Sequence, residues 1–153
     1  MLPSLQRPST AEVRSAIRVF RAIVEGAAPV DYAELTAAIT NLMNIAARMK
    51  GEPAGDEEQT LQRRSSPADH VVVQERFTEL RVLTADDDAA SDLWTAMPLD
   101  DLGDLYHDIR VSEDMFECGD ETGARWDFRF GFENHWGEHA LSLVGYLLHS
   151  YRA

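Results

Sequence analysis

The chain has 153 residues, of which 44% are hydrophobic, and it carries a net charge of −13 at pH 7. This length fits one domain that buries roughly 70% of its unfolded surface, and the single cysteine, Cys118, excludes an internal disulfide. No window approaches the roughly 20 apolar residues of a membrane span, and residues 1–8 lack the apolar run of a signal peptide. We therefore expect a cytoplasmic protein that forms one domain over residues 1–153.

The negative charge is confined to the second half of the chain. Residues 1–85 hold 11 acidic and 10 basic side chains, whereas residues 86–138 hold 16 acidic side chains and three arginines. An acidic surface repels phosphate backbones, so it disfavours nucleic acid and favours a basic protein partner. A well-solvated acidic face with no partner is the simpler interpretation.

Two capping patterns open the predicted helices of the first third. Ser9 with Glu12 and Asp31 with Glu34 each precede an apolar stripe of helical spacing, and glycines end both stripes. These signals predict a helical hairpin over residues 9–50.

A polar connector over residues 51–66 follows the hairpin and has no apolar period. Ser66 and Pro67 form the next start signal, because proline is tolerated in the first turn of a helix. The apolar stripe behind them predicts a helix that reaches Thr84. The remaining helices are expected within residues 67–153.

Aspartates 86–88 end that helix and are expected to open a short one that Pro98 closes. Asp100 or Asp101 is then expected to open a helix that ends at Cys118. These helices would carry most of the acidic charge of the chain.

The last segment contains conflicting periodicities. Trp126, Phe128, Phe130 and Phe132 alternate with polar residues, which favours a strand, but the apolar residues from Trp136 onward have helical spacing. A lone strand cannot satisfy its backbone hydrogen bonds, so we predict one long helix over residues 123–151. The fold class is then all-α, a single bundle of five or six helices with this long C-terminal helix at its centre.

The most suggestive local motif is H-x-x-E-H, formed by His135, Glu138 and His139. On a continuous helix the two histidines lie one turn apart on one side and are candidate ligands of a divalent transition metal. A catalytic zinc site needs a third protein ligand, and His149 does not share the helix face of His139. A three-histidine bundle site would have to take its third ligand from His70 or His107. The helical wheel places Glu138 outward, so helix packing is the simpler role for both histidines.

A second metal pattern is the acid-x-x-His spacing of Asp104 and His107, of which a di-metal bundle would need two copies. Asp101, Asp104 and Asp108 lie opposite an apolar stripe and are expected to face water. With a fourth aspartate they form the candidate interaction surface, which comprises Asp100, Asp101, Asp104 and Asp108.

No complete catalytic constellation is present in the sequence. There is no glycine-rich phosphate loop, and neither a G-x-S-x-G nor an S-x-x-K motif occurs. Acidic neighbours disfavour the thiolate of Cys118, so we expect an inert thiol. We therefore expect no enzymatic activity and no cofactor, with a single divalent transition metal as the alternative.

Two stretches resemble a bacterial family of uncharacterised helical proteins. Residues 99–109 (LDDLGDLYHDI) are similar to that family's D-D-L-x-D-I-Y-x-D-L helix, and residues 126–139 (WDFRFGFENHWGEH) to its W-x-x-R-x-x-F-x-x-H-W-G-x-H helix. The resemblance implies an all-α bundle and supports a helix across the alternating aromatic residues. It implies no activity, because the family has none assigned.

Three functions are compatible with these features. The leading prediction is a non-enzymatic accessory protein that binds another protein through its acidic half. The alternative is a bundle that binds a metal or small ligand through His135 and His139. A nucleic-acid mimic that blocks a DNA-binding protein is a third hypothesis.

Overall fold

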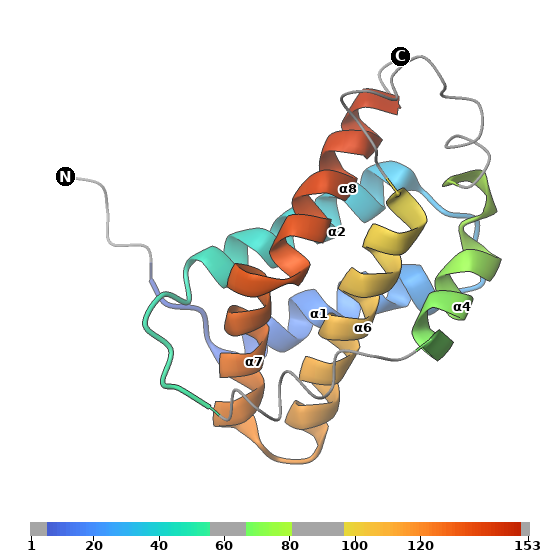
Figure 1. Ribbon diagram of the computed structural model, residues 1–153. Helices are drawn as coiled ribbons and strands as arrows, with labels where there is room; N and C mark the ends of the chain where they lie inside the picture. The colour runs from blue at the N-terminus through green and yellow to red at the C-terminus, as the bar shows by residue number, and fades with distance from the viewer. Residues whose placement is uncertain (1–5, 56–66, 81–96, 151–153) are drawn as a thin grey trace.

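The computed structural model describes residues 6–55, 67–80 and 97–150, and no strand occurs among them (Figure 1). The expected all-α fold is confirmed. Six helices carry labels: α1 (Thr10–Glu25), α2 (Tyr32–Ala47), α4 (Pro67–Arg76), α6 (Pro98–Glu117), α7 (Glu121–Asn134) and α8 (Trp136–Ser150). With helical residues 78–80 the described part holds seven helical segments, slightly more than the expected five or six.

The hairpin of α1 and α2 forms through the caps that the sequence indicates. The Ser9 side chain accepts a hydrogen bond from the Glu12 amide, and the Asp31 carboxylate accepts from the Ala33 and Glu34 amides. The guanidinium group of Arg48 at the end of α2 lies 3.4 Å from the carboxylate of Glu12 at the start of α1, measured between nitrogen and oxygen. The two helices are therefore antiparallel.

The boundaries of α4 and α6 differ from the predicted ones. Helix α4 begins at Pro67 as expected but ends at Arg76, and the predicted continuation to Thr84 lies partly outside the described residues. Helix α6 begins at Pro98 and not at the expected Asp100 or Asp101, because proline suits the first position of a helix, where its missing N–H has no partner to lose. The short helix expected before Pro98 falls mainly on residues 81–96, which the structure does not describe.

The C-terminal segment is two helices, so the prediction of one long helix over residues 123–151 is wrong. His135 ends α7 with non-helical backbone angles, and α8 starts at Trp136. The break lets the Trp136 indole fold back onto α7, where its N–H donates to the Phe128 carbonyl oxygen at 2.9 Å. The alternating aromatic residues themselves lie on α7, as predicted, and Trp126 stacks on Phe130 one turn later.

Helix α6 is enclosed by its neighbours, and this enclosure positions the candidate site. It packs against α1, α4, α7 and α8, and Figure 1 shows it between α4 and the pair of C-terminal helices. Its buried side chains therefore include polar ones, His107, Asp108, Ser112 and Glu113, beside the apolar stripe. Helix α8, which was expected at the centre, packs against α2, α6 and α7.

None of the described helices combines the length and the apolar character that crossing a membrane requires.

Candidate functional site

Three side chains from different helices meet beside the break between α7 and α8. Asp104 of α6, His135 at the end of α7 and His139 of α8 each offer a ligand atom, and these atoms lie within 4.8 Å of one another. The two imidazole rings contact each other edge to face at 4.8 Å between centroids. The three side chains are 27–30% exposed, so solvent reaches the cluster.

The carboxylates of the cluster come from one face of α6. Asp101, Asp104 and Asp108 are spaced three and four residues apart, which places them above one another on a helix. The expectation that these aspartates face water is wrong for Asp108, which is buried, whereas Asp101 and Asp104 are partly exposed. All three carboxylates contact histidines of the C-terminal segment. Helix α6 is covered on several sides and not only along its apolar stripe.

Each of the three side chains is held by a further polar group. His139 Nδ1 lies 2.8 Å from Asp101 Oδ1, and His135 Nδ1 lies 2.6 Å from Asp108 Oδ2. His70 Nε2 of α4 lies 3.1 Å from Asp104 Oδ1. Paired supports of this kind fix the orientation of histidine and carboxylate ligands in metal sites.

These contacts decide which ring nitrogens can bind a ligand. An ionised carboxylate only accepts hydrogen bonds, so Nδ1 of His135 and of His139 carries the proton in each contact. The Nε2 atom is therefore the nitrogen that each histidine can offer to a ligand, and that of His139 lies 3.3 Å from Asp104 Oδ2.

The His139 imidazole sits between two carboxylates, and this raises its pKa. The hydrogen bond with Asp101 is the main cause; burial opposes it, and the charges of Asp104, Asp101 and Asp108 add to it. A proton on Nε2 would face Asp104. A metal ion at that nitrogen would take the place of this proton.

The other predicted ligands lie elsewhere. His107 is buried and directed to Asp69, with 2.5 Å between its Nδ1 and Oδ2 of Asp69, which also accepts from Arg110. His70 pairs with Asp104 but does not belong to the three-residue group. The third candidate ligand is thus Asp104 and neither of the two histidines proposed for that position, because α6 presents this aspartate to the α7–α8 break.

The H-x-x-E-H pattern is not one turn of a continuous helix. His135 is the C-cap of α7, whereas His139 lies inside α8, so the ring proximity comes from the break and from Asp108 and Asp101. Glu138 is exposed, as the helical wheel predicts, and does not join the cluster.

The signal that sequence reasoning missed is the complementarity of two faces. One helix carries aspartates at i, i+3 and i+7, and a later segment carries two histidines four residues apart. Asp104 was assigned to an acidic interaction surface together with Asp100, Asp101 and Asp108. Of these four, Asp100 is partly exposed, and the other three contact histidines.

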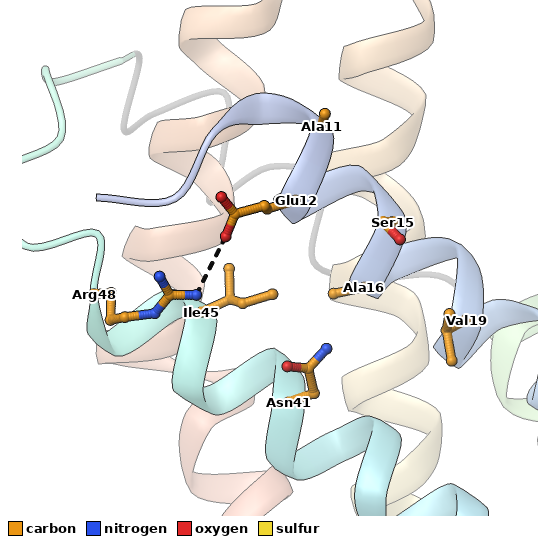
Figure 2. A pocket seen from close by; sticks show the side chains of 8 residues that line it. All are labelled: Ala11, Glu12, Ser15, Ala16, Val19, Asn41, Ile45 and Arg48. Carbon is orange, nitrogen blue, oxygen red and sulfur yellow. Dashed lines mark hydrogen bonds and ion pairs between the residues drawn. The ribbon is translucent and has the colours of Figure 1, made fainter. Parts of the chain in front are cut away.

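Two hollows lie away from this cluster. A shallow groove of about 440 Å³ runs between α1 and α2, and Figure 2 shows Arg48 paired with Glu12 across it and Ser15 and Asn41 at its walls. A larger, mainly apolar hollow of about 940 Å³ lies between the start of α2 and the end of α8. Neither contains a histidine or a cysteine in its lining, so neither competes with the cluster as a metal site.

Comparison with known proteins places the chain in a family. The search of curated proteins and the search of solved structures found no match. A family model described as a domain of unknown function, DUF5063, matches residues 8–153, which include every member of the cluster. The chain therefore belongs to the DUF5063 family.

Proposed function

We propose that this protein binds one divalent transition metal ion through Asp104, His135 and His139. The observation that carries the proposal is the convergence of their three ligand atoms within 4.8 Å from α6, from the α7–α8 break and from α8. The packing of α6 against α7 and α8 brings Asp104 to the two histidines.

The donor set suits particular metals. Two imidazole nitrogens and one carboxylate oxygen form a common set for Zn²⁺ and for non-haem Fe²⁺. Three protein ligands leave at least one coordination position for water or a small ligand, and the partial exposure of the three side chains gives access to it. This is the ligand count of an exchangeable or reactive metal site, whereas a closed structural zinc site has four.

The surroundings of the three residues also favour a cation. Asp101 and Asp108 each accept from the Nδ1 of one histidine, which leaves Nε2 as the donor to metal. Together with Asp104 they place three carboxylates around two imidazoles, so acidic groups outnumber the histidines at the site before a metal binds. A bound divalent ion would offset this charge.

Metal content and thermal stability test the proposal. Tag-free protein is stripped with a chelator, and Zn²⁺ or Fe²⁺ is returned under anaerobic conditions. We expect about one equivalent by elemental analysis and a raised Tm, since ligand at 100 times Kd stabilises the folded state by about 2.7 kcal/mol. Asp104→Asn and His139→Ala should lose both the metal and the shift.

A matched control is His149→Ala, which removes an exposed histidine of α8 that lies outside the cluster. It should retain the metal stoichiometry of the wild type. The proposal is wrong if wild-type protein holds no metal after reconstitution. It is also wrong if His139→Ala and wild type hold the same amount of metal.

Binding to a protein partner is a second proposal, favoured by the 16 acidic side chains of residues 86–138. A basic partner would bind with an affinity that falls as salt screens the charges. Pull-down at low and high ionic strength tests it, and the absence of any salt-sensitive partner would count against it.

A further inference from the structure

His70 on α4 joins the candidate metal site to a separate helix. Its Nε2 lies 3.1 Å from Asp104 Oδ1, while the other oxygen of that carboxylate, Oδ2, lies 3.3 Å from His139 Nε2. The two oxygens of Asp104 therefore have different partners. His70 holds one of them, and the other is directed to the cluster of ligand atoms.

The approach of His70 to α6 depends on the glycine beside Asp104. A Cβ atom added at Gly103 would overlap the His70 ring, with 2.8 Å to Nε2. Gly103 is buried within the helix. A glycine inside a helix destabilises it relative to alanine, so its presence here is explained by the close approach of the imidazole.

A second polar contact anchors α4 on α6 one residue earlier. Asp69 is buried and accepts hydrogen bonds from Arg110 Nε at 3.0 Å, and it contacts His107 Nδ1 at 2.5 Å. Asp69 and His70 thus hold α4 on α6 through two acid–histidine pairs that run in opposite directions. The pair that contains Asp104 is the one that a metal ion would touch.

We propose that His70 is a positioning residue for the metal ligand Asp104, so that metal binding and the docking of α4 strengthen each other. The inference rests on the proposed metal site. His70 holds Oδ1 and leaves Oδ2 for the ion, and a bound ion in turn fixes the carboxylate that His70 contacts. Because coupling between two events is reciprocal, a gain in metal affinity from docked α4 requires an equal gain in docking from metal.

Metal affinity in His70 variants tests the positioning role. Loss of a supporting partner typically weakens metal binding 10–100-fold, so His70→Ala should raise the Kd for Zn²⁺ by this factor in a competition titration with a chromophoric chelator. His70→Gln retains an amide donor and should recover part of the affinity. Val71→Ala, an exposed change on the same helix, should leave the Kd unchanged.

Gly103→Ala provides an independent variant that leaves His70 and Asp104 intact. The new methyl group displaces the imidazole from Asp104, so the Kd for Zn²⁺ should rise as in His70→Ala. The visible spectrum of the Co²⁺ form should keep its band intensity in both variants, because the three ligands are unchanged. If the spectrum of His70→Ala indicated a different coordination number of Co²⁺, His70 would itself be a ligand, and the positioning role would be overturned.

Hydrogen exchange of the α4 amides measures the reciprocal effect. Zn²⁺ should slow exchange in residues 67–76 of the wild type and should do so far less in His70→Ala. Equal Kd values for Zn²⁺ in wild type and His70→Ala would overturn this inference, and so would a rate of α4 exchange in wild type that did not change with Zn²⁺. Neither result would contradict the proposed metal site. Wild type that binds no metal would overturn the proposed function itself.

Discussion

Trp136 is the residue on which the geometry of the candidate site most depends. Its side chain is 1% exposed, and its ring lies 5.1 Å from the rings of both Phe128 and Phe132 between centroids. Its indole N–H donates to the Phe128 carbonyl oxygen. Because Trp136 follows His135 directly, the packing of this indole also fixes where the histidine ring can lie.

Truncation of Trp136 should be costly. Trp136→Ala removes a buried aromatic side chain, and we expect the free energy of unfolding of the metal-free protein to fall by about 3–5 kcal/mol in urea denaturation. Trp126→Ala, at a half-buried position of α7, is the comparison and should cost less. A loss below about 1 kcal/mol for Trp136→Ala would place the indole at the surface.

At the level of elements, the break between α7 and α8 requires a residue without a side chain one turn earlier. A Cβ atom added at Gly131 would lie 2.7 Å from the Trp136 ring. The Gly131 carbonyl oxygen accepts the His135 amide at 2.8 Å, so α7 keeps its regular hydrogen bonds up to the break. A small residue at this position therefore allows the next helix to fold its first side chain back onto α7.

Gly131→Ala should destabilise the protein although alanine is the better helix former. Alanine gains about 1 kcal/mol in a helix interior, but overpacking against the indole costs about 1–3 kcal/mol. In the Trp136→Phe background the smaller ring should reduce this penalty. A double-mutant cycle by urea denaturation measures the coupling, and strictly additive effects would contradict the contact.

On the scale of the whole molecule, Glu52 links parts that are far apart in the sequence. Its side chain is 3% exposed and accepts from Arg7 near the N-terminus and from Arg125 of α7. Burial on its own raises the pKa of this carboxyl, but the hydrogen bonds from Arg125 and Arg7 and their charges outweigh burial, and the pKa is lowered. Glu52 thereby ties the start of the chain to its C-terminal helices.

The lowered pKa gives Glu52 a defined pH dependence. Its contribution to the free energy of unfolding is fully present above the unfolded-state pKa, about 4.3, and is lost as the pH falls through the lower folded-state pKa. Glu52→Gln should therefore be less stable than wild type by about 1.5–3 kcal/mol at pH 7. The difference should shrink as the pH falls below about 4.

Urea denaturation between pH 7 and pH 3 measures this difference. Glu12→Gln is the matched control, because Glu12 pairs with Arg48 at an exposed position, where ion pairs contribute about 1 kcal/mol or less. A gap between Glu52→Gln and wild type that stayed constant with pH would contradict the role of the carboxylate charge.

The sequence by itself determined the local structure of this protein. Ser9 and Asp31 cap helices as their spacing with Glu12 and Glu34 predicts, because capping is a contact within one turn. The alternating aromatic residues around Phe128 are helical, since no strand partner exists among the predicted elements. Even His135 and His139 were identified as candidate ligands from a pattern of five residues.

Only the tertiary structure decided where the helices break and which residues meet. The break at His135 depends on the Trp136 indole packing on α7 and on Gly131 and Gly137, where an added Cβ atom would overlap the Trp136 ring and the Phe132 carbonyl group. Asp104 becomes a candidate ligand because α6 is covered on several sides, which turns a polar stripe inward. Local propensity and periodicity describe one helix at a time, whereas a site shared by three helices depends on how their faces pack together.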